Sequence, residues 1–288
     1  MTEPAGAGRA LSVEDPGLLS TVQDLGRPGH AHLGVPLSGA LDGPALRLAN
    51  RLVGNAEGAA AIETTATGGA FRSTRAVTVA VTGAECGLEV GGRAVAWGAP
   101  VPVRAGEVVR IGSARAGLRS YLAVAGGIAV DPVLGSRSTD LLSGLGPAPL
   151  QAGDVLPLGA PAGEPAAAEA VPRASAGVVR VLPGPHLDWF VAGALDAMAT
   201  AYVVLPASNR IGLRLDGPAL ERVDPGRELP TEPMVLGAVQ VPPSGRPVVF
   251  LHDHPTTGGY PVIAVVRGAD LVACAQARPG ERITFRRD

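Results

Sequence analysis

The densest group of chemically capable residues lies near the end of the sequence, in FLHDHPTTGGYPVIAVV (250–266). In extended backbone His252 and His254 project to one face and Asp253 to the other, so the two imidazoles could bind one metal ion. A second H-x-H pair occurs at 30–32. No cysteine or carboxylate has a spacing that completes either pair. We therefore favour hydrogen-bonded or exposed histidines and predict no metal site.

The segment continues with two threonines and two glycines, Thr256, Thr257, Gly258 and Gly259, and then Tyr260. Glycines permit close backbone approach, so the N–H groups and hydroxyls of this turn could form an anion-binding nest. A tight loop between two strands is the alternative, and it is the commoner structure for such a sequence.

A second group of donors lies in ASNRIGLRL (207–215), which contains Asn209, Arg210 and Arg214. Arginine recognises carboxylate and phosphate groups through paired N–H bonds. A solvent-exposed face with no ligand is the alternative interpretation.

The polar residues of the segment 17–55 form a third group. Asp24 and Arg27 are expected to form a structural pair buried under a loop, and Asp42 is placed to cap a helix. The sequence lacks a GxSxG motif, and Cys86 lies in an apolar turn. No serine or cysteine nucleophile system is therefore indicated.

Composition excludes several functions. All 24 basic residues are arginine, so the chain cannot form a lysine Schiff base, carry biotin or lipoate, or supply the lysine of a phosphate-binding loop. A net charge of −2 gives no footprint for nucleic acid. Cys86 and Cys274 are expected to be free and buried. No apolar run reaches the roughly 18 residues of a membrane span, so no membrane partner and a cytoplasmic location are expected.

The elements that must position these residues are mainly strands. Forty glycines and 27 prolines punctuate short β-branched runs, and GLEVGGRAVAW predicts a hairpin with Gly91 and Gly92 in its turn. A helix is predicted near 42–54, and another in HLDWFVAGALDAMA (186–199). The Ala/Pro-rich stretch 159–177 is typical of a linker. It divides the sequence into β-rich halves at 1–158 and 178–288.

Several long segments resemble one known family. They include STVQDLGRPGHAHLGVPLSGALDGPALRLANRLVGN, RSYLAVAGGIAVDPVLGSRSTD, SNRIGLRL and GAVQVPPSGRPVVFLHDHPTTGGYPVIAVV. Together they resemble the C subunits of bacterial 5-oxoprolinase, a family that also includes allophanate hydrolase subunit 2, which is part of the carboxyltransferase-like domain of urea carboxylase, and Kip-type antagonists of a kinase inhibitor. The resemblance extends from about residue 10 to 286.

The resemblance implies a cyclophilin-like β-barrel architecture and a complex with subunits B and A that hydrolyses 5-oxo-L-proline to L-glutamate. ATP with Mg²⁺ is expected to be supplied to the complex, and this chain alone is expected to be inactive and able to self-associate. Two alternatives stay open: a carboxyltransferase half of a urea or amide carboxylase, with biotin on another protein, or a regulatory binding partner. Pro255 stands where the family usually has glutamine, which puts activity or substrate in question.

The resemblance and the three polar groups together predict a cleft shared with a partner subunit. The expected catalytic residues are Asp253, Tyr260 and Asp24. The residues expected to bind substrate or nucleotide are Arg27, Asn209, Arg210, Arg214, Thr256, Thr257, Gly258 and Gly259.

Overall fold

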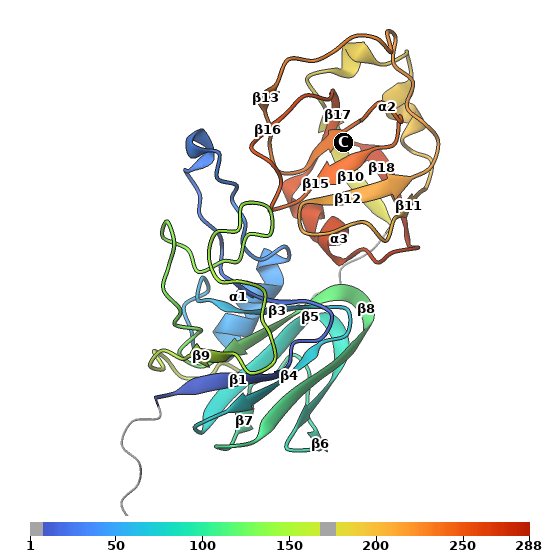
Figure 1. Cartoon of the computed structure of the whole chain (residues 1–288). Helices are drawn as coiled ribbons and strands as arrows, with labels where there is room; N and C mark the ends of the chain where they lie inside the picture. The colour runs from blue at the N-terminus through green and yellow to red at the C-terminus, as the bar shows by residue number, and fades with distance from the viewer. Residues whose placement is uncertain (1–7, 168–176) are drawn as a thin grey trace, which may run out of the picture. The chain divides into compact units, whose positions relative to one another are not determined.

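The computed structural model describes residues 8–167 and 177–288 (Figure 1). These residues form two compact units. Unit 1 comprises 8–27, 42–139 and 144–167, and unit 2 comprises 28–41, 140–143 and 177–288. Two short segments from the first half of the sequence thus belong to unit 2. The predicted linker 159–177 lies partly outside the described residues, at 168–176.

Unit 1 is built on a nine-stranded sheet. Six of its strands follow the order β2-β3-β8-β4-β1-β9, and the other three join through β5, which pairs with β8, β6 and β7. Figure 1 shows the long strands β5 and β8 running side by side, and they pair antiparallel with three irregularities in register. The strands are β1 (Ala10–Asp15), β2 (Ser20–Gln23), β3 (Ala61–Thr65), β4 (Gly69–Ser73), β5 (Val77–Val90), β6 (Arg93–Ala94), β7 (Val101–Val103), β8 (Val108–Val124) and β9 (Val155–Pro157).

The β5–β6 connection confirms the predicted hairpin. Val90 pairs with Arg93, and the two residues between them, Gly91 and Gly92, have φ angles of 55° and 76°. A two-residue hairpin turn with positive φ at both positions requires residues that tolerate left-handed backbone, and glycine does so at no steric cost.

The helix predicted after Asp42 is α1 (Gly43–Leu52). The Asp42 carboxylate accepts a hydrogen bond from the backbone N–H of Ala45, 3.0 Å away, which satisfies one of the free donors of the first turn. Pro44 occupies the first turn, where its missing N–H costs nothing. The helix packs against β5 and β8, and its buried residues are Ala45, Leu46, Leu48, Ala49, Asn50 and Leu52.

Unit 2 contains a closed seven-stranded barrel with the order β10-β17-β14-β15-β12-β11-β18. Its strands are β10 (Val178–Pro183), β11 (Tyr202–Val204), β12 (Gly212–Asp216), β14 (Ala238–Gln240), β15 (Val248–Phe250), β17 (Val262–Val266) and β18 (Arg282–Arg287). A separate ribbon pairs β13 (Glu232–Pro233) with β16 (Thr257–Gly258). The short helices are η1 (Ala31–Leu33), η2 (Leu187–Trp189), α2 (Ala194–Ala197), η3 (Gly268–Asp270) and α3 (Leu271–Gln276).

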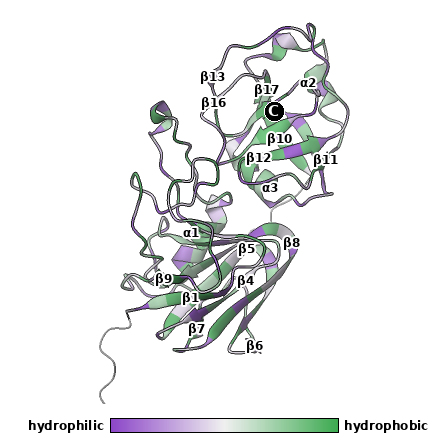
Figure 2. Cartoon of the chain, viewed as in Figure 1, coloured by the Kyte–Doolittle hydropathy of each residue, from purple (hydrophilic) through white to green (hydrophobic). Residues whose placement is uncertain are grey.

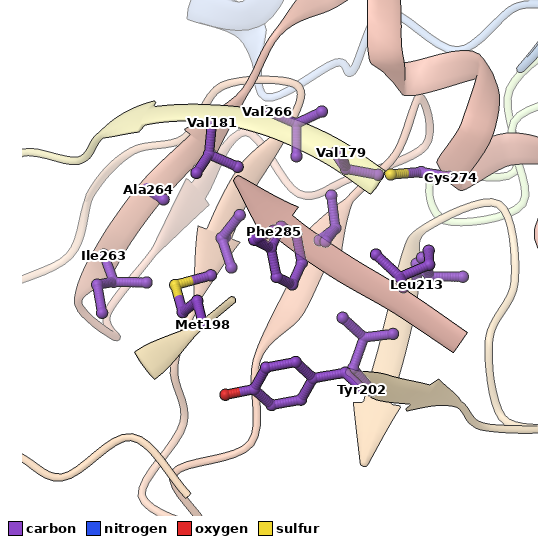
Figure 3. Packing of buried hydrophobic residues seen from close by; sticks show 14 of the residues in the cluster. Val179, Val181, Met198, Tyr202, Leu213, Ile263, Ala264, Val266, Cys274 and Phe285 are labelled. Carbon is purple, nitrogen blue, oxygen red and sulfur yellow. The ribbon is translucent and has the colours of Figure 1, made fainter. Parts of the chain in front are cut away.

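The barrel encloses an apolar core, and hydrophobic residues predominate on β10 and β17 (Figure 2). Ile283 and Phe285 alternate with outward-facing residues along β18, and Phe285 lies at the centre of the cluster in Figure 3. Cys274 packs into the same core, and burial raises the pKa of its thiol to about 12. Burial also raises the pKa of Cys86. Both cysteines are free and buried, as predicted.

These elements confirm a mainly β barrel architecture with few short helices. The prediction of one helix over 186–199 is wrong. The segment instead forms η2 and α2, because Phe190 is extended and Gly193 adopts a left-handed φ of 83° between them. Among the helices of residues 8–167 and 177–288, none has the length and apolar character needed to cross a membrane.

Candidate functional site

Asp253 and Arg210, two residues predicted for the site, form a buried ion pair in unit 2. The guanidinium binds the carboxylate through two parallel bonds, Nε to Oδ2 at 2.9 Å and Nη2 to Oδ1 at 3.0 Å. The Asp253 side chain is 0% exposed and that of Arg210 is 1% exposed. A pair removed from water in this way is stable only when its remaining donors and acceptors are also satisfied.

Those remaining groups are satisfied by the two short segments that join unit 2. Ser38 Oγ donates to Asp253 Oδ1 at 2.9 Å, and the backbone N–H of Leu141 donates to Oδ2 at 3.2 Å. Arg210 Nη2 also donates to the carbonyl of Gly39 at 2.7 Å. Asp253 therefore anchors the loops 36–41 and 140–143 to the barrel, and neither member of the pair is exposed to a ligand in this structure. The catalytic role of Asp253 and the ligand-binding role of Arg210 stay predictions.

The threonine-glycine segment is a strand of the small ribbon. Thr257 pairs with Pro233 and Gly258 with Glu232, and the carbonyl of Thr256 accepts from the backbone N–H of Met234. A nest requires left-handed backbone between successive N–H groups, and neither Gly258 nor Gly259 has a positive φ. The nest geometry considered from the sequence is therefore wrong, because pairing with β13 holds this segment extended.

His254 is held by its neighbours. Its ring stacks on Phe250, with ring centroids 5.8 Å apart and an angle of 13° between the planes. Its Nδ1 lies 2.7 Å from the carbonyl of Pro255, and because a carbonyl can only accept, Nδ1 carries the proton. Burial lowers the pKa of His254, while the Pro255 carbonyl and the charge of Asp253 oppose that shift.

This shift makes stability depend on pH. Because the folded-state pKa of His254 lies below its unfolded value, the unfolded chain binds more protons once the pH falls below about 6.5. The contribution of the neutral His254 side chain to the unfolding free energy is therefore intact above that pH, and it is lost as the pH falls through the folded-state pKa. We expect His254→Gln to flatten the dependence of unfolding free energy on pH between about 7 and 5, by at most about 1.4 kcal/mol per pH unit. Urea denaturation across that range measures it, and equal slopes in both proteins would contradict it.

The three side chains of 207–215 that were predicted to bind a ligand lie in different surroundings. Asn209 Oδ1 accepts from the backbone N–H groups of Ile211 and Gly212, at 2.9 and 3.2 Å, and so closes a local turn. Arg210 is buried against Asp253, whereas Arg214 on β12 is exposed. The structure therefore does not bring the three predicted donors together.

Asp24 and Arg27 lie in unit 1, in a network with the loop 133–139. Asp24 Oδ1 accepts from Ser136 Oγ and Ser138 Oγ, both at 2.6 Å, and Oδ2 accepts from the backbone N–H of Arg137 at 2.6 Å. Arg27 Nη2 donates to the carbonyl of Ser138. The expected Asp24–Arg27 pair is wrong: within the described residues no ion pair joins them. The loop binds each side chain separately, and the buried Nη1 of Arg27 is left without a hydrogen-bond partner there.

Gly259 and Tyr260 line a cavity of about 440 Å³ in unit 2. That volume falls in the range of roughly 300–1,000 Å³ that is typical of small-molecule sites. Other side chains lining it are Arg222, Arg227, Glu228 and Leu229. Sequence reasoning missed the three charged residues. The signal that could have found them is the charge-rich turn ERVDPGREL (221–229), which has no recognisable motif spacing.

The chain matches a family model and named relatives. The model for the carboxyltransferase domain, subdomain A and B, matches residues 33–287. The 5-oxoprolinase C subunit of Escherichia coli (strain K12) is 41% identical over 280 residues, covering 96% of this chain and 90% of that protein. The 5-oxoprolinase C subunit of Haemophilus influenzae is 36% identical, covering 92% of this chain and 87% of that protein. Urea amidolyase of Lachancea kluyveri is 35% identical, and the match covers 96% of this chain but only 17% of that protein.

Solved structures share the fold. A protein designated TTHA0988 superposes with a TM-score of 0.88 at 41% identity, over 99% of this chain and 56% of its own. The K. lactis urea amidolyase superposes with a TM-score of 0.89 at 31% identity, over 96% of this chain and 18% of its own. This chain thus spans little more than half of the first structure and less than a fifth of the second. On the family model and the E. coli relative together, the chain belongs to the carboxyltransferase domain family, subdomains A and B, as its polar segments predicted.

Proposed function

We propose that this chain is the C subunit of an ATP-dependent 5-oxoprolinase, which hydrolyses 5-oxo-L-proline to L-glutamate together with subunits A and B. The observation that carries the proposal is identity of 41% along 96% of the chain to a protein named as the C subunit of 5-oxoprolinase, itself covered to 90%. A match of that extent leaves no large part of either chain unaligned.

The chemistry of a lactam explains why ATP is needed. Opening the ring of 5-oxoproline is unfavourable near neutral pH, and phosphorylation of the amide oxygen converts a poor electrophile into an imidate that water attacks. The protein must then stabilise charge around a phosphoryl group. In a chain without lysine, arginine side chains and backbone N–H groups are the available donors.

The described residues do not fit ATP with Mg²⁺. Arg27 and Arg210 are buried and bonded to protein oxygens, and Gly258 and Gly259 do not form a nest. Across 8–167 and 177–288 no three His, Cys, Asp or Glu side chains gather as metal ligands would. We therefore place the nucleotide on a partner subunit and assign to this chain a part of the site for the amide substrate.

The test is ATP-dependent release of glutamate from 5-oxoproline by this chain mixed with its A and B subunits, with each omitted in turn. We expect glutamate only when all three are present, and none from this chain alone. Full activity without this chain would contradict the proposal. Omission of each partner in the same preparation is the internal control.

A second function has its own support. The urea amidolyase relatives also match 96% of this chain, at 35% and 33% identity, so a carboxyltransferase half acting on urea or another amide is the alternative. Biotin would then arrive on another protein, because this chain has no lysine to carry it. If the three subunits associate but release no glutamate, carboxylation of urea in the presence of a biotin carrier decides for this alternative.

A further inference from the structure

The cavity lined by Gly259 and Tyr260 carries an arginine whose hydrogen bonds are incomplete. Arg222 Nη2 donates to the carbonyl of Val241 at 2.7 Å, and Arg222 also forms a β-bridge with Phe190. Its Nε is buried, and in the described part of the chain it has no hydrogen-bond partner. Buried donors are rarely left in this state, and water or a bound acceptor normally completes them. Arg222 thus brings a positive charge to the cavity lining, and the Val241 carbonyl holds its guanidinium in place.

A second guanidinium faces the same cavity and is already oriented. Arg227 lies over the ring of Trp189, 3.8 Å from the centroid, so its flat face is occupied while its N–H groups lie at the edge. Trp189 is in turn held edge-on by His186, at 5.9 Å. The turn that carries Arg227 is closed by Asp224, whose Oδ1 accepts from the backbone N–H of Gly226 at 2.9 Å.

The segment that carries Tyr260 is held by two hydrogen bonds. Val262 N–H donates to His186 Nδ1 at 3.1 Å, and the carbonyl of Tyr260 accepts from Gln240 Nε2 at 3.2 Å. The Tyr260 side chain itself is 44% exposed. Glu228 adds one carboxylate to the lining, and neither it nor Arg227 has an ion-pair partner within the described residues. The residues lining the cavity therefore bring together two guanidinium groups, one carboxylate and one phenol.

We propose that this cavity binds a small carboxylate that also carries an amide, with its carboxylate on Arg222 and Arg227 and its amide toward Glu228 and Tyr260. Two guanidinium groups against one carboxylate favour an anion. Glu228 can accept from an amide N–H, and the Tyr260 hydroxyl can donate to an amide oxygen. The choice of 5-oxo-L-proline as the representative ligand rests on the proposed function, whereas the anion site itself rests on the cavity.

The experiment is calorimetric titration of the full chain with 5-oxo-L-proline and with 2-pyrrolidone, which has the same lactam and no carboxylate. We expect saturable binding of 5-oxo-L-proline, with 2-pyrrolidone at least about tenfold weaker. Arg222→Gln should weaken 5-oxo-L-proline binding by about tenfold or more, since a charged hydrogen-bonding partner is lost. Arg227→Gln and Tyr260→Phe test the other contacts at more exposed positions, where folding is least at risk.

Arg246→Gln is the matched control, because Arg246 is an exposed arginine of unit 2 that pairs with Asp216 at 2.7 Å and does not line the cavity. It should bind as the unsubstituted chain does. Equal affinity for the two ligands, unchanged binding by both arginine variants, or no saturable binding at millimolar concentrations would each overturn the proposal.

The outcome separates this proposal from the proposed function. If the three-subunit mixture releases glutamate but Arg222→Gln leaves KM unchanged, the cavity is not the substrate site and the function stands. If the chain binds 5-oxo-L-proline through Arg222 but the mixture releases no glutamate, the anion site stands and the function fails.

Discussion

Asp253→Ala is expected to lower the unfolding free energy of unit 2 by about 3–5 kcal/mol, the cost of removing one partner of a buried ion pair. The change leaves the Arg210 guanidinium 1% exposed and without its carboxylate, and it also removes the acceptor of Ser38 Oγ and Leu141 N–H. Denaturation followed by tryptophan fluorescence measures it, because the chain has two tryptophans, Trp97 in unit 1 and Trp189 in unit 2. In a Trp97→Phe background the signal reports unit 2 alone.

The exposed pair Arg246–Asp216 in the same unit supplies the control. Its side chains are 56% and 48% exposed, so Asp216→Ala should cost less than about 1 kcal/mol. The comparison also tests the catalytic role predicted for Asp253. If the Asp253→Ala variant keeps its stability but the three-subunit mixture that contains it has no turnover, the Asp253 carboxylate has a catalytic role. If the variant loses stability but its folded fraction turns over normally, the role of Asp253 is to anchor the loops 36–41 and 140–143.

Local rules predicted the fold well where a few neighbouring residues decide the structure. The Gly91-Gly92 hairpin and the Asp42-capped helix were both predictable because turn chemistry and capping act over two to four residues. The same rules failed over 186–199, where apolar spacing favours a helix. Gly193 can continue or break a helix, and tertiary packing of Trp189 and Phe190 in the barrel core decided against it.

The site was only partly predictable, because burial and distant partners leave no mark in local spacing. Arg210 and Asp253 were both recognised as site residues, but their 43-residue separation hides the pairing that buries them. Arg222 and Arg227 occur in a segment that looks like an ordinary charged turn. Only the fold places that turn beside Tyr260 and around one cavity.

Asp24→Ala is expected to lower the unfolding free energy of unit 1 by about 2–5 kcal/mol. The Asp24 carboxylate is the acceptor for four donors, and each buried donor left unsatisfied costs about 1–3 kcal/mol. The hydroxyls of Ser136 and Ser138 can rotate toward other acceptors, whereas the backbone N–H groups of Gly26 and Arg137 cannot. Fluorescence of Trp97 in a Trp189→Phe background measures unit 1 alone.

Asp15 offers a control with the same local geometry, because its Oδ1 also accepts from the N–H of the glycine two residues on, Gly17, at 2.8 Å. The corresponding bond from Gly26 to Asp24 Oδ1 is likewise 2.8 Å. Asp15 is exposed and Asp24 is 8% exposed, so the two variants differ mainly in the distant loop that Asp24 holds. Asp15→Ala should cost less than about 1 kcal/mol, the value of an ordinary solvated hydrogen bond. Equal losses in the two variants would show that the short turn, and not the network with 136–138, accounts for the stability that Asp24 provides.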